Sequence, residues 1–232
     1  MAGRRWRRRR LSVRFQDAAP DGRAIVYAHV QADPLVVGLA DLLAHATPAQ
    51  RVLARAAMNG ESAEAPIWRA MFPTCFPDDR SEAILAASLA VAGRGDQVRD
   101  QSRGAVVEAL TERLLRRRSD AVRRERRILF DGVRAEVHPY DVTVEIDGRA
   151  EAYDCKWGAR GISADVLYQL DDARSNAAAE DESLAVALVV FDTRLACRVR
   201  LDRQTAPHDA TGLVTIESMD ALAGGRRREP IR

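Results

Sequence analysis

The chain has 232 residues, of which 47% are hydrophobic and 30% charged, and its formal net charge is +2. This length predicts one large domain, or one domain with a smaller addition, that buries a sizeable core. Its three cysteines are far apart and its four histidines do not cluster, which argues against a disulfide framework and a structural zinc site and favours a reducing cytoplasm. No stretch approaches the ~20 apolar residues of a membrane span, and no apolar run follows the basic N-terminus, so neither a membrane segment nor a signal peptide is expected.

The positive charge is unevenly distributed along the chain. Arginines surround Trp6, gather again between residues 113 and 127, and recur at residues 226–228. Such local clusters attract a polyanion more strongly than a net charge of +2 suggests. Solvated helix faces and tails are the alternative explanation.

The N-terminal part predicts mostly helices. Residues 1–23 are expected to form a basic flexible arm that ends in a turn, and residues 24–30 a strand. Asp33-Pro34 and Thr47-Pro48 are helix-start signals. The helices expected in this part cover residues 34–44, 48–58, 65–71 and 79–92.

Residues 24–99 are therefore expected to form an α-rich subdomain of unknown role, through which a homodimer or a protein partner could bind. The turn at Asn59-Gly60 between two helices also suggests a helix-turn-helix regulator. Pro66 would interrupt the second helix, so we expect a packing role for this segment instead.

From residue 100 the pattern alternates helix and strand. A helix over residues 104–118 is followed by a strand that starts at 128–130 and continues over 133–137. The remaining expected elements are strands over 141–146 and 150–156, a helix over 163–178, strands over 184–191, 197–201 and 213–216, and a short helix over 219–222. Residues 100–222 are expected to form the main domain and residues 223–232 a basic tail.

Lys156 is the only lysine among 36 lysines and arginines. A GC-rich genome that replaced lysine by arginine would explain the composition, but not why the remaining lysine stands in Asp154-Cys155-Lys156. An ammonium is compact and shifts its pKa readily, unlike a guanidinium. The position of Lys156 therefore indicates a functional role for its ammonium group.

A hairpin brings acids to this lysine. A two-residue turn at Asp147-Gly148 pairs Ile146 with Arg149, and the same register sets Asp141 opposite Asp154. Asp154 and Lys156 are two residues apart on a strand and share a face. Two carboxylates and one amine are thus expected together.

This set suits hydrolysis of a phosphodiester with a divalent cation. Carboxylate oxygens favour Mg²⁺ or Mn²⁺, which can activate water and stabilise developing charge, and Lys156 can orient that water. Glu108 lies between apolar residues of the preceding helix and could reach the metal or its water. Gly104, one turn earlier, would let this helix approach the sheet.

Residues 100–192 resemble the PD-(D/E)XK, or restriction-endonuclease-like, nuclease superfamily. The matching pieces are Glu108, Asp141 in Pro139-Tyr140-Asp141, and Asp154-Cys155-Lys156. The resemblance implies an α/β fold, a restriction-endonuclease-like core of helix, three-stranded antiparallel meander, helix and strand, with a mixed central sheet flanked by helices and an N-terminal, mostly helical addition. It also implies that Asp141 and Asp154 bind metal, that Lys156 serves the attacking water, and that Glu108 assists the metal.

The chain departs from the family pattern in three ways. Tyr140 separates Pro139 from Asp141, so the strict Pro-Asp pair is absent. Tyr168-Gln169 on the following helix does not match the order of the exonuclease-like branch, so that branch is not assigned. Glu145 is a competing acid on the strand of Asp141 and could support the site.

The sequence therefore predicts a divalent-metal-dependent endonuclease acting on DNA, in bacterial defence such as antiviral defence, or in DNA processing. Arginine suits phosphate binding. The arginines expected to contact the nucleic acid are Arg116, Arg117, Arg123, Arg124 and Arg160. A non-catalytic module of the same fold that binds nucleic acid or protein is the alternative. Trp157 could stack on a base, although a core position is expected.

Overall fold

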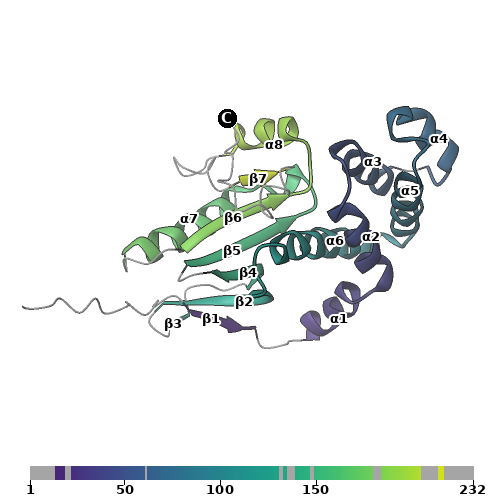
Figure 1. Ribbon diagram of the computed structural model, residues 1–232. Coiled ribbons are helices and arrows are strands. Elements are labelled where there is room, and N and C mark those ends of the chain that lie inside the picture. The colour runs from purple at the N-terminus through teal and green to yellow at the C-terminus, as the bar shows by residue number, and fades with distance from the viewer. Residues whose placement is uncertain are drawn as a thin grey trace, which may run out of the picture.

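The computed structural model describes residues 14–18, 22–60, 62–130, 133–134, 139–146, 149–179, 184–204 and 214–216. The elements, in chain order, are β1 (Arg14–Asp17), α1 (Gly22–Gln31), α2 (Pro34–Ala44), α3 (Pro48–Asn59), α4 (Ala65–Met71), η1 (Pro73–Cys75), α5 (Asp79–Ala92), α6 (Asp96–Arg116), β2 (Val122–Phe130), β3 (Val133–Arg134), β4 (Tyr140–Ile146), β5 (Arg149–Lys156), η2 (Ala159–Gly161), α7 (Ala164–Ala179), β6 (Leu184–Val190), α8 (Arg194–Leu201) and β7 (Val214–Ile216). Figure 1 shows the helices that precede α6 gathered at one end of the sheet.

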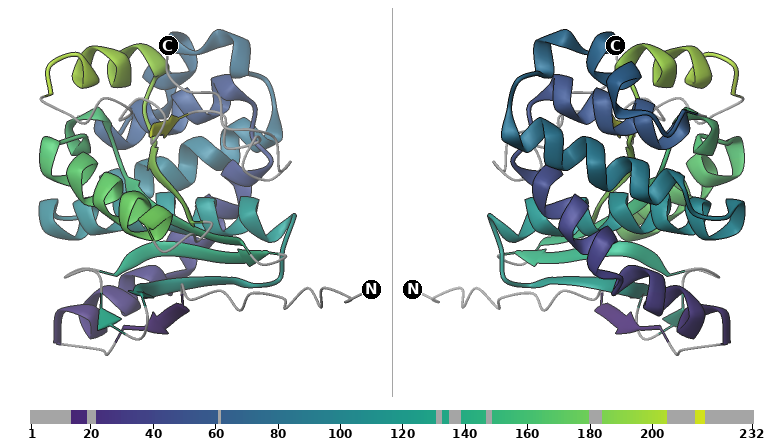
Figure 2. Two further views of the ribbon diagram at one scale, coloured as in Figure 1. Left: turned by 90° about the vertical axis from the view of Figure 1, so that its left-hand side faces the viewer. Right: turned by 90° about the vertical axis from the view of Figure 1, so that its right-hand side faces the viewer.

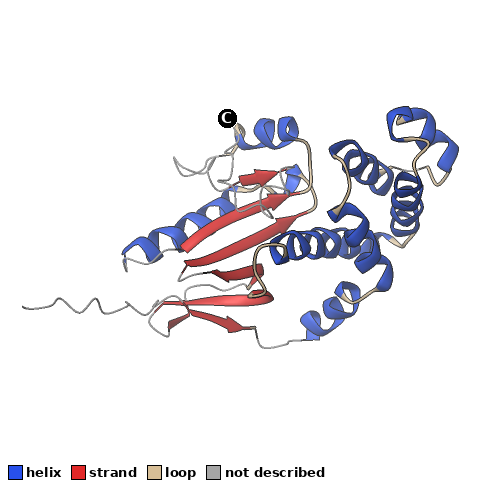
Figure 3. Cartoon of the chain, viewed as in Figure 1, coloured by secondary structure: helices blue, strands red, loops and turns tan. Residues whose placement is uncertain are grey.

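The centre of the molecule is a mixed sheet of seven strands in the order β1-β2-β4-β5-β6-β7, with β3 paired to β2 (Figure 3). The pairs β1–β2, β2–β4 and β4–β5 are antiparallel, whereas the pairs β5–β6 and β6–β7 are parallel. The expected α/β class, with a mixed sheet flanked by helices, is confirmed. The chain also passes through α6, the antiparallel strands β2, β4 and β5, then α7 and β6, which is the predicted order.

Alternating side chains of the sheet pack against helices on opposite faces. On β6, Ala187 and Val189 join the cluster that contains α6, whereas Val186, Leu188 and Val190 join the cluster that contains α7. The two side views show the helices on either side of the sheet (Figure 2). Burial on both faces explains why β6 reads as a continuous apolar run.

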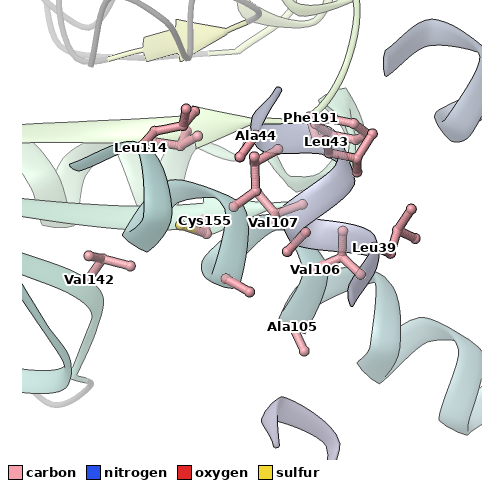
Figure 4. Packing of buried hydrophobic residues seen from close by; sticks show 14 of the residues in the cluster. Leu39, Leu43, Ala44, Ala105, Val106, Val107, Leu114, Val142, Cys155 and Phe191 are labelled. Atoms are coloured by element: carbon pink, nitrogen blue, oxygen red, sulfur yellow. The ribbon is translucent and has the colours of Figure 1, made fainter. Parts of the chain in front are cut away.

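The core on the α6 side extends into the N-terminal helices. Leu39 and Leu43 of α2 lie in one buried cluster with Val142 of β4 and Cys155 of β5 (Figure 4). The boundary expected between residues 99 and 100 falls inside α6. A separate function for residues 24–99 stays a prediction.

The start signals of α2 and α3 act as predicted. Asp33 accepts a hydrogen bond from the backbone N–H of Leu35 at 2.8 Å. Thr47 and Gln50 form a capping box, in which the Thr47 hydroxyl accepts from the Gln50 N–H at 3.2 Å and the Gln50 amide oxygen accepts from the Thr47 N–H at 2.8 Å. These caps satisfy donors that the first turn leaves unpaired.

Pro66 does not interrupt a helix, contrary to the prediction. Pro66 lies in the first turn of α4, where the missing N–H of proline costs nothing. The Asn59-Gly60 turn serves packing: a Cβ at Gly60 would come within 2.4 Å of the Trp68 ring. Trp68 is 5% exposed, so a buried side chain of the core occupies the space next to Gly60.

Two predicted strands are helices. Residues 24–30, expected as a strand, belong to α1, and residues 197–201 belong to α8. In α8 the Thr193 hydroxyl caps the helix by accepting from the Ala196 N–H at 3.1 Å, and Cys197 and Leu201 are buried one turn apart. Tertiary contacts have overridden the local strand pattern in both segments.

Other boundaries differ less. Part of the expected arm is strand β1, which pairs with β2, while residues 1–13 and the tail at 223–232 lie outside the described residues. Helix α6 and strand β2 both begin earlier than predicted, and β3 covers residues 133–134 of the strand expected over 133–137, whose other residues lie outside the described ranges. The strand predicted over 213–216 is confirmed as β7, and the helix over 219–222 lies outside the described residues.

In the part of the chain that the structure describes, no helix combines the length and apolar character that crossing a membrane requires.

Candidate active site

The predicted hairpin register is confirmed. Ile146 pairs with Arg149, and the ladder continues to Val142 opposite Tyr153. One further step places Asp141 beside Asp154. Here a side chain, not the backbone, links the two strands: the Asp141 Oδ2 accepts a hydrogen bond from the Cys155 N–H at 2.5 Å. This bond holds the Asp141 carboxylate at the edge of the sheet where β5 ends.

Asp154 and Lys156 form an ion pair on β5, with 2.6 Å between the Lys156 Nζ and the Asp154 Oδ1. Burial alone would lower the pKa of Lys156, but the charges of Asp154 and Asp141 outweigh it and raise this pKa. Lys156 is therefore an ammonium at neutral pH in this arrangement. It can donate hydrogen bonds to water or to a phosphate oxygen, but it cannot accept a proton.

Glu108 enters from α6 and is held by α1. Its Oε1 accepts from the Tyr27 hydroxyl at 2.5 Å and its Oε2 from the Gln31 side-chain amide at 2.7 Å. Burial raises the pKa of Glu108, although these two hydrogen bonds and the charges of Arg124 and Lys156 act to lower it. The charges of Glu108 and Lys156 thus interact, while both Glu108 oxygens accept hydrogen bonds from side chains of α1.

Gly104 has a different role from the one expected. A Cβ at this position would come within 3.1 Å of the Tyr27 hydroxyl. The absence of a side chain at Gly104 therefore makes room for Tyr27 beside Glu108, on the side of α6 that faces α1. The predicted close approach of α6 to the sheet is not what this glycine provides.

Glu125 is a further acid that the sequence analysis missed. The pairs on either side of it, Arg124 with Val142 and Arg126 with Tyr140, place Glu125 across from Asp141. Its φ is 50°, a left-handed conformation that a strand residue seldom adopts. The Gln31 amide donates to Glu125 at 3.1 Å as well as to Glu108, and burial followed by the Glu108 charge raises the pKa of Glu125.

Tyr27 was missed because residues 24–30 were expected to be a strand, and Gln31 because it follows that segment directly. Their four-residue spacing puts them on the same face of a helix, and this was the signal available in the sequence. Glu125 interrupts an otherwise basic run of β2, Val122–Phe130. That interruption was the only sequence signal for Glu125.

The carboxylates repel one another at Asp141. Burial is the largest cause that raises the pKa of Asp141 well above its ordinary value, followed by the charges of Glu108 and Asp154. The Lys156 charge and the Cys155 N–H oppose this shift without cancelling it. Such a group gains from a bound proton or a bound cation.

The donor set suits a hard cation chemically, since Asp141 and Asp154 supply carboxylate oxygens at the same end of the hairpin. Across the ranges described above, no three or more His, Cys, Asp or Glu side chains are placed as one group that could hold a metal ion. The two aspartates are therefore the protein ligands to consider, with the remaining positions of the ion left to water or substrate.

The predicted phosphate-binding arginines divide into two kinds. Arg116 and Arg124 pair with Glu112, at 2.7 and 2.5 Å, and Arg117 donates to the Ala44 carbonyl at 2.7 Å. Arg123 and Arg160 are exposed, and Arg123 donates to the backbone carbonyls of Asp120 and Val122. Arg123 and Arg160 are thus the more available for a polyanion, whereas Arg124 also stabilises the fold.

Two more expectations concern side chains near the site. Glu145 does not support the aspartates; it is exposed and pairs with Arg126 at 2.9 Å. Trp157 packs against Phe191, with 5.2 Å between the ring centroids, and its indole N–H donates to Asn59 at 2.9 Å. Arg103 lies over the Trp157 ring, 5.8 Å from its centroid. Trp157 is thus partly buried and packs against the core cluster without being one of its buried members, so the expected core position is confirmed only in part.

Comparison with known proteins finds no matching family model, no matching curated protein and no matching solved structure.

Proposed function

We propose that the protein is a divalent-metal-dependent nuclease that hydrolyses phosphodiester bonds of DNA, with a restriction-endonuclease-like core of the PD-(D/E)XK kind. One observation carries the proposal: the Cys155 N–H holds the Asp141 carboxylate beside the Asp154–Lys156 ion pair. This gives two acids and one ammonium at the same edge of the sheet. The helix–meander–helix–strand order supports the same assignment.

Each residue then has a distinct role. Asp141 and Asp154 would hold Mg²⁺ or Mn²⁺. A bound ion of this kind supplies Lewis-acid stabilisation of the phosphate and lowers the pKa of a bound water. Lys156, as an ammonium, donates to the attacking water or to a non-bridging phosphate oxygen and stabilises the charge that develops there. Asp154 keeps Lys156 in place until substrate binds.

Glu108 would assist from the second layer of the site. Its oxygens are bonded to Tyr27 and Gln31, so Glu108 acts on Asp141 through its charge in this arrangement. The negative charge of Glu108 raises the free energy of an unprotonated Asp141 and so favours a cation next to it. Direct contact with the ion or its water would require Glu108 to leave one of these hydrogen bonds.

Arginines would hold the phosphate backbone. Arg123 and Arg160 are exposed, and Arg116 is 58% exposed despite its bond to Glu112. Backbone contacts of this kind position a nucleic acid without reading its sequence. A role in bacterial defence or in DNA processing is part of the proposal through analogy with the fold alone.

The test is cleavage of supercoiled plasmid, linear duplex and single-stranded DNA, with RNA in parallel, in Mg²⁺, in Mn²⁺ and in EDTA. We expect cleavage only with metal, and a loss of about 10²-fold or more in Lys156→Ala and Asp154→Asn. Lys156→Arg should be inactive as well, because a guanidinium is larger and planar. Asp165→Asn, an exposed acid in the first turn of α7, is the control that keeps activity. Full activity in both Lys156→Ala and Asp154→Asn would refute the site.

A second function has one observation in its favour. Both oxygens of Glu108 are already hydrogen-bonded to α1, as expected if the acids served structure alone. The chain would then be a non-catalytic module that binds nucleic acid or protein. Binding of DNA with no cleavage in any divalent metal would favour that function.

A further inference from the structure

We propose that a pocket at the carboxyl end of β6 binds a single nucleotide unit of the polynucleotide, next to the proposed active site. The inference rests on the proposed nuclease function for its substrate class. The pocket lies between α3 and the segment that leads from β6 to α8, and it measures about 450 Å³ including the space where it opens to solvent. Its walls include Arg51, Val52 and Arg55 of α3, and Phe191 and Asp192 after β6.

The pocket and the proposed active site share an edge of the sheet. Val190, in the pocket wall, pairs with Lys156 in the parallel register of β5 and β6. The next residue, Phe191, donates its N–H to the Lys156 carbonyl at 2.9 Å. A polynucleotide whose backbone passes Lys156 therefore has this pocket within the reach of a neighbouring nucleotide.

Asp192 anchors the polar side of the pocket. Its side chain is 6% exposed and pairs with Arg55 at 2.7 Å. It also accepts from the Ala159 N–H at 2.9 Å and from the Thr193 N–H at 2.6 Å. With several donors directed at it, the carboxylate is fixed, and it fixes one end of the Arg55 guanidinium in turn.

Arg55 retains capacity for an anion. Its side chain is 29% exposed, and its Nε is buried without a hydrogen-bond partner among the described residues. A buried donor without an acceptor is unfavourable, so Arg55 gains if its guanidinium turns to bring the Nε–H to an incoming oxygen. The planar guanidinium suits a phosphate, which can accept several such bonds. Arg51, one turn away on α3, is 6% exposed and donates its Nε–H to the Leu43 carbonyl at 3.2 Å, so it adds positive charge to the same wall without direct contact.

The rest of the wall suits a base. Val52 is 37% exposed and supplies most of the apolar surface, while Phe191, which is 7% exposed, and the buried Val190 form the floor beneath it. Stacking and apolar contact with a base tolerate any sequence, because every base has an apolar face. A phosphate on Arg55 and a base on the apolar wall together define a nucleotide. A free nucleotide and a unit of a polynucleotide share this chemistry, and the test separates them.

The first experiment fills the pocket in metal-free protein. Binding of deoxyadenosine 5′-monophosphate is measured by calorimetry, and binding of a short single-stranded DNA by fluorescence anisotropy, both in EDTA. We expect Val52→Trp to weaken both by about tenfold, because the indole takes the space that the base would fill. Val98→Trp is the matched control, because Val98 is 45% exposed on α6 and lies outside the pocket, and it should bind as the wild type does.

The second experiment separates phosphate from base. Arg55→Lys keeps a positive charge beside Asp192 but loses the buried Nε donor and the planar fork. It should weaken binding of the monophosphate and leave binding of deoxyadenosine unchanged. Thermal unfolding of each variant shows whether the fold is intact.

The outcomes are independent of cleavage. Failure of the wild type to bind the monophosphate, or equal binding by Val52→Trp, would overturn the pocket even if metal-dependent cleavage is found. Binding of the free nucleotide with no effect of Val52→Trp on the oligonucleotide would overturn the claim that the pocket takes a unit of the polymer. Pocket-dependent binding of both probes without cleavage would support the pocket and count against the nuclease.

Discussion

Gly161 lies directly against the side chain of Lys156. A Cβ at Gly161 would come within 2.8 Å of the Lys156 Cβ and 2.9 Å of its Cγ, closer than such atoms approach in proteins. The η2 turn that contains Gly161 follows β5 directly, so the loop after the strand limits where the lysine chain can lie. The ammonium is thus positioned from two sides, by Asp154 at its tip and by Gly161 along its stem.

Gly161→Ala should therefore displace Lys156 and reduce cleavage by about 10- to 100-fold, since a shift of about 1 Å in a catalytic group has effects of this size. The measurement is kcat/KM on the substrate that the wild type cleaves. Gly38→Ala is the control: no atom lies within 4 Å of a Cβ at that position, and alanine favours the helix. Wild-type cleavage by folded Gly161→Ala would show that the position of Lys156 is not critical.

Asp141→Asn should raise the free energy of unfolding while it abolishes activity. The amide oxygen can still accept from the Cys155 N–H, whereas the negative charge that repels Glu108 and Asp154 is removed. We expect the metal-free variant to be more stable by about 1 kcal/mol and inactive, because a neutral amide is a poorer ligand for Mg²⁺. Urea unfolding in EDTA and a cleavage assay test the two effects.

The same variant has a pH signature in EDTA. Because burial and neighbouring charges raise the pKa of Asp141, the folded wild type binds a proton more readily than the unfolded chain. Wild-type stability therefore falls as the pH rises from the ordinary carboxyl pKa of about 4 through the raised value. The advantage of Asp141→Asn should be largest at neutral pH and shrink toward pH ~4. An advantage that is constant with pH would contradict the repulsion.

The hairpin could be predicted because local chemistry decides it. A two-residue turn with Asp-Gly fixes the register of the strands beside it, and period 2 then assigns the faces. This was enough to place Asp141 beside Asp154 and Lys156. The same local signals placed α2 and α3, whose caps lie within a few residues of the helix starts.

Contacts distant in sequence decided the elements that were predicted wrongly. Tyr27 in α1 bonds to Glu108, 81 residues away, and Ile25 and Val26 are exposed although they favour strands. In α8, Cys197, Val199 and Leu201 alternate like a strand, yet Val199 is 42% exposed while the other two are buried one turn apart. Neither arrangement can be read from a short window of sequence.

Tyr27→Phe tests how α1 holds Glu108. Removing the hydroxyl leaves one oxygen of a buried carboxylate without its donor, so the fold should lose about 1–2 kcal/mol. Tyr168→Phe is the control, because Tyr168 is 44% exposed on α7, and it should unfold as the wild type does. Equal unfolding midpoints for the two variants in urea would mean that the Tyr27 bond contributes nothing to the folded state.

Arg124 and Arg123 are neighbours on β2 with different expected roles. Arg124 bonds to Glu112 through its Nε at 2.6 Å and through a terminal nitrogen at 2.5 Å, and the Glu112 side chain is only 12% exposed. Without Arg124, that carboxylate keeps only Arg116, which is 58% exposed. Arg124→Ala should therefore destabilise the protein by about 2 kcal/mol, less than a fully buried pair because Arg116 remains.

Arg123→Ala should do the opposite. Arg123 is exposed and donates to backbone carbonyls, so its removal should change the unfolding free energy by less than about 0.5 kcal/mol. If it contacts a phosphate, DNA binding weakens for every sequence and the salt dependence of log K falls by about one unit. Anisotropy titrations across a range of salt concentrations measure this slope. An unchanged slope in Arg123→Ala would remove Arg123 from the DNA-binding surface and leave Arg160 and Arg116 as the exposed arginines to test.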